Sequence, residues 1–409
     1  MAENKGYCMK IFYMLFYAIL AISLGCQIGP PKSSFYAHEY EKALDACKQT
    51  VEENPTGKNY AYHRLFLASV AFTMGRYQEA NQALREALKV MESYGNDETK
   101  ELMAMVGSER GKEYKGDPFE KMMAHFYTGM TFYFMGDYVK ALAGFKNALG
   151  ADMMSPREEY KRDCVLMHFM AAKACFALGE EENAAMFLRE ALSQSPKNPY
   201  LDFAKLKKSN LLILVEAGKG PGKRAVGSGE SVELLEKIDF PEDSVEILIN
   251  GESMGKASLM ADVFAQADTC GRSKASSLRE AKGVAGDLAM GMPLLQSKAD
   301  TRVWSFLPGK VFGFCKDVPE GFHTITLRFY DKEGAILSNY EQTWYYCPVK
   351  KDTVYCFRSG KNKGNSEPDG NFVPKPLQPP ATKTKPEDAK GLWPGTQQYE
   401  NFLFGKKGL

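Results

Sequence analysis

The hydrophobic pattern changes its period near the middle of the chain. Up to about residue 200, apolar residues recur at intervals of three and four, which places them on one face of an α-helix. Beyond that point, short runs of β-branched and aromatic residues are separated by Gly, Asp and Asn, which is typical of strands and turns. The pattern therefore predicts an α+β chain with more than one domain, helical first and β-rich second.

One phrase recurs three times in the helical half. It reads MGRYQEA from Met74, MGDYVKA from Met135 and, more weakly, LGEEENA from Leu178. After the last Ala of each copy, a large apolar residue and then another Ala follow at the same spacing. The phrase resembles the tetratricopeptide repeat (TPR), a helix-turn-helix unit of about 34 residues. This resemblance implies a TPR-like α-solenoid over residues 36–205, in which small alanines let neighbouring helices approach closely.

The resemblance also implies a groove, because the first helix of each repeat lines the inner face of such a solenoid. The residues at these positions are all apolar or aromatic: Leu65, Phe72, Met123, Phe126, Met130, Tyr133, Phe169 and Phe176. An apolar surface that contains methionine can bind an amphipathic helix or peptide of a partner protein. An apolar stripe at helical spacing is also typical of packed core. Two interpretations therefore stay open, a partner groove or a face that the second half of the chain covers.

Residues 209–359 predict a β-rich domain. Asn250-Gly251 directly follows a strand-like run and is the strongest two-residue signal for a hairpin. We expect an antiparallel β-sandwich of about seven short strands, with an inserted helix at about residues 257–295. Helical spacing is carried there by Leu278, Ala281, Ala285, Leu288, Met292 and Leu295. The strand-like runs occupy residues 211–215, 232–238, 245–249, 324–329, 343–346 and 353–357.

Three phrases of this half resemble a family of bacterial envelope lipoproteins that joins tetratricopeptide repeats to a β domain. They are LLILVEAGKGP at residues 211–221, ADTRVWSFLP at residues 299–308 and VPEGFHTITL at residues 318–327. The resemblance implies a place in the cell envelope and implies no enzymatic activity.

The N-terminus predicts export. Lys5 and Lys10 precede an apolar run over residues 11–22, which has the length of a signal-peptide core and falls short of the roughly 20 residues of a transmembrane helix. The run ends in Ser-Leu-Gly-Cys, which resembles a bacterial lipoprotein signal with residues 1–25 removed and Cys26 acylated. The resemblance implies a lipid anchor, at the outer membrane facing the periplasm if the cell is Gram-negative. Ordinary secretion, with Cys26 as a thiol without a role, is the alternative.

Charge and composition narrow the function classes. The 52 basic and 51 acidic residues give a formal net charge of +1, which excludes the basic surface of a dedicated nucleic-acid-binding protein. The five histidines include no HExxH motif, and the nine cysteines include no CxxC pair. We therefore expect no metal, no cofactor and no catalytic constellation. Residues 218–224 look like a phosphate loop but end in Arg instead of Ser or Thr, so we expect a mobile basic turn.

Three further groups of residues carry expectations. Asp300, Arg302 and Trp304 form the most site-like cluster, either as a buried structural bridge or as a ligand clamp. Residues 360–409, rich in Pro, Lys and Gly, are expected to be disordered. An exported protein meets an oxidising compartment, and the disulfide candidates are Cys315, Cys347 and Cys356.

Together these patterns predict a non-enzymatic, lipid-anchored scaffold or adaptor of the cell envelope. Its partner would be an envelope protein or peptide that binds in the groove of the repeats. The alternatives are a cell-wall-associated accessory protein that binds glycan or peptide through the β domain near Arg302 and Trp304, and a purely structural surface protein.

Overall fold

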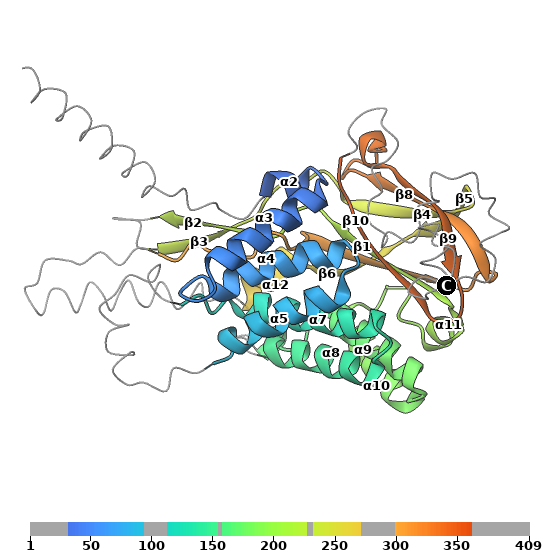
Figure 1. Ribbon diagram of the computed structural model, residues 1–409. Helices are drawn as coiled ribbons and strands as arrows, with labels where there is room; N and C mark the ends of the chain where they lie inside the picture. Colours follow the sequence, from blue (N-terminus) through green and yellow to red (C-terminus); the bar gives the residue numbers. More distant parts are fainter. Residues whose placement is uncertain (1–31, 94–112, 154–157, 227–231, 271–298, 362–409) are drawn as a thin grey trace, which may run out of the picture.

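A computed structural model describes residues 32–93, 113–153, 158–226, 232–270 and 299–361 (Figure 1). Several predictions lie outside these described residues. They are the signal peptide at residues 1–25, the lipidation site Cys26, the helical pattern from Leu278 to Leu295, and the tail after residue 361.

The helical half is a row of antiparallel helices. Its elements are α2 (Lys32–Tyr36), α3 (Tyr40–Glu53), α4 (Tyr60–Thr73), α5 (Tyr77–Met91), α7 (Pro118–Phe134), α8 (Tyr138–Asp152), α9 (Val165–Leu178), α10 (Glu181–Gln194) and the short α11 (Phe203–Lys208). A short 3₁₀ helix, Glu158–Tyr160, precedes α9. Neighbouring helices along the chain pack against each other, as a solenoid of repeats requires.

The recurring phrase marks the tight turns between paired helices. Gly75, Gly136 and Gly179 end α4, α7 and α9 with φ angles of 70°, 79° and 77°, a left-handed conformation that costs glycine little. The alanine that closes each copy of the phrase is fully buried at Ala80, Ala141 and Ala184. The local sequence therefore sets both the end of one helix and the close approach of the next.

The β-rich half contains three sheets in its described residues. Sheet A has the order β10-β1-β7-β6, sheet B is the hairpin β2-β3, and sheet C has the order β5-β4-β8-β9. The strands are β1 (Leu211–Ala217), β2 (Gly222–Val226), β3 (Val232–Glu236), β4 (Ser244–Ile249), β5 (Glu252–Lys256), β6 (Ser258–Asp262), β7 (Lys310–Lys316), β8 (Gly321–Tyr330), β9 (Gln342–Val349) and β10 (Thr353–Arg358). The short helix α12 (Val263–Cys270) follows β6, and a 3₁₀ helix, Ser338–Tyr340, precedes β9.

Sheet A lies between the helices and sheet C (Figure 1). Every residue of β1 is buried, and its side chains alternate between two cores. Leu212 and Leu214 pack into the core shared with the helices, whereas Leu211, Ile213 and Val215 pack into the core shared with sheet C. The molecule thus has three layers in which helices and sheet C cover the two faces of sheet A.

The predicted fold class, a TPR-like helical region followed by a β-rich region with antiparallel sheets, is confirmed. The predicted hairpin at Asn250-Gly251 is confirmed as the β4–β5 turn. Two details differ from the prediction. Strand β10 pairs with β1 in parallel, and residues 258–262, expected at the start of the inserted helix, form β6 against β7.

The expected mobile basic turn at residues 218–224 is also wrong. Gly218 and Gly309 contact the ring of Phe240 so closely that an added Cβ at either position would lie 2.2 Å from a ring carbon. Lys223 lies in β2, which pairs with β3, and its side chain is only 7% exposed. The glycines therefore serve packing rather than a phosphate-binding loop.

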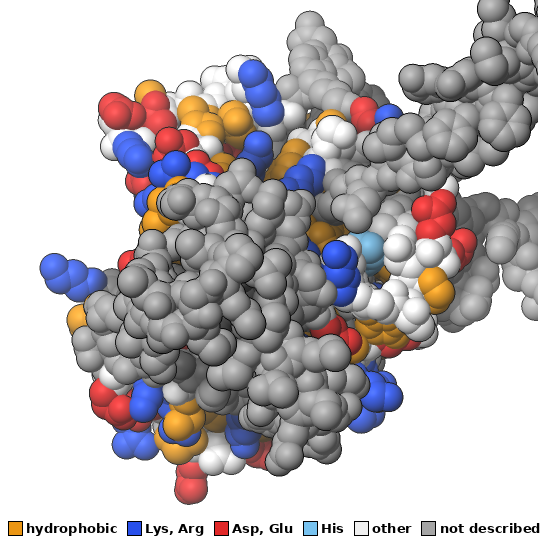
Figure 2. Space-filling model, turned by 90° about the vertical axis from the view of Figure 1, so that its left-hand side faces the viewer, with side chains coloured by type: hydrophobic (Ala, Val, Ile, Leu, Met, Phe, Trp, Pro, Cys, Tyr) orange, Lys and Arg blue, Asp and Glu red, His pale blue; other side chains and the backbone are white. Residues whose placement is uncertain are grey.

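The distribution of charge on the surface agrees with the nearly equal numbers of acidic and basic residues. On the described part of the face shown in Figure 2, acidic and basic side chains are interspersed and no single charge dominates. None of the helices that the structure describes combines the length and apolarity needed to cross a membrane.

Candidate functional site

The inner face of the repeats is part of the protein core. Of the eight residues predicted to line a partner groove, Phe176 is half-buried and the other seven are at most 6% exposed. They share one continuous core with sheet A residues such as Leu212 and Val311. The prediction of an open groove along these residues is therefore corrected: they are buried both by packing between the helices, as Phe126 packs against Phe145 on α8, and by the sheet A residues of the same core. Sheet A requires this cover, since its strand β1 is apolar on both faces.

A segment with a turn at residues 304–307 and no helix or strand, residues 299–309, adds to this cover; we call it the inner segment. Trp304 is fully buried, and its indole Nε1 donates a hydrogen bond of 2.7 Å to Ser69 Oγ on α4. The backbone N–H of Trp304 donates to Glu120 Oε1 on α7 over 2.6 Å. Phe306 stacks on Phe35 with ring centroids 4.0 Å apart. The inner segment thus binds several helices through both main-chain and side-chain groups.

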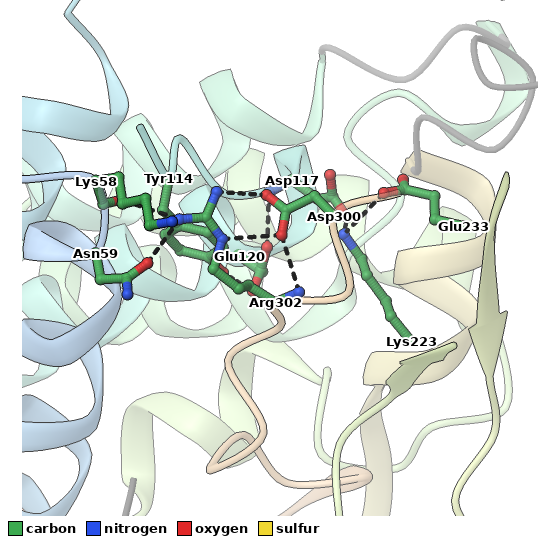
Figure 3. A network of polar contacts seen from close by, with 9 residues as sticks. All are labelled: Lys58, Asn59, Tyr114, Asp117, Glu120, Lys223, Glu233, Asp300 and Arg302. Atoms are coloured by element: carbon green, nitrogen blue, oxygen red, sulfur yellow. Dashed lines mark hydrogen bonds and ion pairs between the residues drawn. The ribbon is translucent and has the colours of Figure 1, made fainter. Parts of the chain in front are cut away.

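Arg302 anchors the start of the inner segment (Figure 3). Its Nε and Nη2 donate to the two carboxylate oxygens of Asp300 over 2.8 and 2.7 Å. Its Nη1 donates to the carbonyl oxygen of Lys58 over 3.0 Å and to Asn59 Oδ1 over 2.8 Å, at the start of α4. Of the two interpretations that the sequence left open, this geometry is that of a structural bridge, which is partly buried, and Trp304 lies in the core beside it.

A group of charged side chains surrounds the N-terminus of α7, and we call it the α7 charge cluster: Asp117, Glu120, Lys223 and Glu233 (Figure 3). Lys223 Nζ lies 2.5 Å from Asp117 Oδ2 and 3.9 Å from Glu233 Oε2. Glu120 is fully buried and accepts hydrogen bonds from the backbone N–H of Asp117, at 2.7 Å, and from the hydroxyl of Tyr114. The cluster joins the second repeat to the β2-β3 hairpin.

The electrostatics of the α7 charge cluster follow from its burial. Burial raises the pKa of Glu120, and the nearby charge of Lys223 acts in the opposite direction. Burial acts to lower the pKa of Lys223, but the carboxylates of Asp117 and Glu120 outweigh this and raise it. Sequence reasoning missed the cluster, although Asp117-Pro118 followed by Glu120 carries a capping-box signal for a helix start.

Two further ion pairs hold buried cations, one between β1 and β10 within sheet A and the other between α9 and the turn that precedes β10. Glu216 on β1 accepts a hydrogen bond of 2.6 Å from Tyr127 on α7 and one of 3.1 Å from Arg358 on β10. Lys173 on α9 lies 3.0 Å from Asp352, and the lysine side chain is only 2% exposed. In the described part of the chain, no group of three or more His, Cys, Asp or Glu residues is arranged to hold a metal ion. The bond from Tyr127 to Glu216 and the pair of Lys173 with Asp352 join the helices to the β-rich half.

The three cysteines considered for a disulfide are free thiols in the structure. Cys347 packs in the core between the two sheets, whereas Cys315 and Cys356 face the helices. Strand β1 lies between Cys315 on β7 and Cys356 on β10, which separates them by two strand spacings of about 5 Å each. A disulfide requires Cα atoms within about 7 Å, so the strand order keeps these cysteines apart.

Comparison with known proteins supports the repeat region. Residues 128–199, which contain the second and third copies of the recurring phrase, match the family described as tetratricopeptide repeat. No curated protein sequence is similar to the chain.

Several solved structures are similar to part of the chain. MamA from residue 41 to its end, from Desulfovibrio magneticus RS-1, is 13% identical with a TM-score of 0.31 and covers 43% of this chain and 77% of that chain. YrrB, described as a TPR protein with an unusual peptide-binding site, is 14% identical with a TM-score of 0.28 and covers 40% and 65%. The first TPR of Spaghetti (RPAP3), bound to an HSP90 peptide, is 14% identical with a TM-score of 0.25 and covers 35% and 86%.

Proposed function

We propose that this protein is a non-enzymatic, lipid-anchored scaffold of the bacterial cell envelope that binds another envelope protein. The observation that supports this proposal is that the helices of the repeats bind the inner segment. This segment contacts several helices and is bound through hydrogen bonds to its backbone at Trp304 and Ser305 as well as through buried aromatic anchors. The repeats of this chain therefore have the chemistry of a peptide-binding surface. Because that surface is filled from within, the partner binds elsewhere on the helical layer.

The partner site that we propose lies at the turn between α7 and α8. We define this turn patch by five apolar residues, of which Val139 is 66% and Met135 is 38% exposed, while Phe132, Phe134 and Tyr138 are half-buried. The patch packs against the preceding repeat, because Phe134 stacks on Tyr77 at the start of α5 with ring centroids 4.5 Å apart. Large apolar side chains gathered at an exposed turn favour the apolar face of an amphipathic helix as the ligand.

A cross-linking experiment tests the turn patch. A photoreactive amino acid replaces Val139 in the full-length chain in the native envelope, and Ile336, which is 52% exposed on the β-rich half, is the matched control position. We expect one discrete protein adduct from position 139 and none from position 336. The adduct is expected to disappear in a Met135→Glu variant, because a carboxylate on the patch opposes apolar docking. Equal adducts from both positions would contradict the proposal.

The lipid anchor that we propose is attached to Cys26. Acyl chains on this residue would tether the protein, since each CH₂ group buried in a bilayer contributes about 0.8 kcal/mol. Intact-mass and detergent-partition measurements on the wild type and on Cys26→Ala test this point. We expect a gain of mass that corresponds to diacylglycerol, partition into detergent, and loss of both in the variant. A wild-type protein that stays in the aqueous phase would contradict the anchor but would leave the partner site untouched.

A further inference from the structure

Sheet C has one face that no other described layer covers. Its inner face packs in the core against sheet A through residues such as Ile247, Ile325 and Leu327. Side chains alternate along a strand, so the residues between them point outward. The outward residues include Glu246 on β4 and Thr326 and Arg328 on β8, which are all partly exposed. We call this surface the outer face of sheet C.

A β-bulge gathers two tyrosines at the edge of this face. Cys347 pairs with His323 and Trp344 pairs with Ile325, so Tyr345 and Tyr346 together stand opposite the single residue Thr324. A regular strand would turn one of the two tyrosines inward. Here both rings reach the surface, with Tyr345 54% and Tyr346 37% exposed.

The bulge requires an unusual backbone conformation. Tyr346 has a φ angle of 57°, in the left-handed region that bulky side chains rarely adopt. Holding a non-glycine residue there costs of order 1 kcal/mol, and such positions cluster at functional sites. A glycine would satisfy the same backbone without this strain, so the tyrosine side chain is retained at a cost in stability.

The rest of the outer face carries polar side chains that are hydrogen-bonded to one another. Glu246 accepts hydrogen bonds from Ser253 Oγ at 2.5 Å and from Tyr330 OH at 2.6 Å, and these bonds lower its pKa. Arg328 Nε donates to Glu341 over 2.6 Å, and Arg328 Nη1 lies 3.9 Å from Glu246.

The charges on the outer face balance. Lys256, which lies 4.4 Å above the ring of Tyr330, and Arg328 are positive, while Glu246 and Glu341 are negative. A face of this kind attracts neither polyanions nor polycations. It offers both donors and acceptors of hydrogen bonds, and the two tyrosines lie opposite Thr324, about 13 Å along β8 from Arg328.

We propose that the outer face of sheet C binds a neutral glycan. The apolar C–H face of a pyranose ring packs on the rings of Tyr345 and Tyr346. The sugar hydroxyls, which donate and accept, exchange hydrogen bonds with the carboxylates and the guanidinium of the network. This site is separate from the turn patch, and it differs from the glycan site expected near Arg302 and Trp304, where Trp304 is fully buried and Arg302 is bonded to Asp300, Lys58 and Asn59.

The test is a titration of the full-length protein with chitohexaose, cellohexaose and maltohexaose by calorimetry. We expect at least one of the three to bind. Tyr345→Ala and Tyr346→Ala should each weaken that binding by about tenfold, as expected for an aromatic anchor. Tyr345→Phe should keep most of the affinity because it keeps the ring. The exposed control Leu234→Ala, in the β2-β3 hairpin, should bind like the wild type.

A second readout separates binding from folding. Tyr346→Gly relieves the strained backbone, so its melting temperature should equal or exceed that of the wild type while its glycan affinity falls with that of Tyr346→Ala. Two outcomes would overturn the proposal: no binding of any of the three oligosaccharides, or binding that survives the loss of both tyrosine rings. Protein adducts from a photoreactive residue at position 345, without glycan binding, would overturn it in favour of a protein ligand.

Discussion

Lys173 and Lys223 are two cations held inside the protein, and each meets a carboxylate from the other half of the chain. Such a pair contributes little to stability in total, because removal of two charges from water offsets their attraction. Loss of one partner is costly, since the other charge then stays buried alone. These residues therefore fix how the β-rich half sits on the repeats.

Lys223→Met should destabilise the protein strongly. It leaves Asp117 and Glu120 buried without their cation, which costs about 3–5 kcal/mol of the free energy of unfolding. The matched control is Lys207→Met, which removes an exposed pair with Glu181, where both side chains are at least 50% exposed. Exposed pairs contribute about 0–1 kcal/mol. Urea unfolding of both variants checks the prediction, and equal losses would contradict it.

The imidazole of His168 predicts a pH dependence of stability. Burial lowers its pKa in the folded protein, although the carbonyl of Arg162, which accepts its Nε2–H at 2.9 Å, acts the other way. The unfolded chain therefore takes up a proton more readily, and stability is lost as the pH falls below about 6.5. Above that pH both states hold a neutral imidazole and the contribution is complete.

His168→Leu should therefore reduce the difference in melting temperature between about pH 7.5 and about pH 5.5. The control is Met167→Leu, which alters an adjacent buried residue without removing a titrating group. It should keep the pH dependence of the wild type. If both variants respond to pH as the wild type does, His168 is not a source of the effect.

At the scale of elements, the helix pair α7 and α8 depends on two facing glycines. An added Cβ at Gly144 would lie 2.6 Å from the Cα of Gly129, so the two helices touch backbone to backbone. Gly150, later in α8, has no heavy atom within 4 Å of such a Cβ. The same substitution at the two positions of one helix should therefore have opposite effects.

Gly144→Ala should destabilise the protein by about 1–3 kcal/mol through overpacking. Gly150→Ala should stabilise it by about 0.5–1 kcal/mol, because alanine favours a helix more than glycine does. Thermal unfolding of the two variants checks the pair. A neutral Gly144→Ala would mean that α7 and α8 do not pack this closely.

Helix ends and turns that depend only on neighbouring residues were predictable from the sequence. Gly75 and Gly136 end helices by their own conformation, and Asn250-Gly251 closes a hairpin without help from distant residues. The parallel pairing of β10 with β1 was not predictable, because a hydrophobic period gives a strand but not its neighbour. Strand β6 was missed for a related reason. A run of five residues with this composition is too short to distinguish a strand from a helix.

At the scale of the whole molecule, sequence alone left the role of the inner face open. Phe126 and Met130 have the apolar helical spacing of a groove and of a core alike. The deciding fact is the two-sided apolar strand β1, which must be covered on both faces. The α7 charge cluster was beyond prediction, because Asp117 and Lys223 meet only through the fold. The capping-box spacing of Asp117 and Glu120 indicates a helix start but not the lysine that pairs with them.

The central claim is that the inner segment closes the groove of the repeats within the same chain. The most direct measurement uses a variant in which Trp344 and Trp393 are replaced by Phe, so that Trp304 is the sole tryptophan. We predict blue-shifted emission, protection from acrylamide, and loss of that emission in urea together with the helical circular dichroism, because Trp304 is fully buried against α4 and α7. Water-like emission from the folded protein, or a change that precedes unfolding of the helices, would contradict the claim.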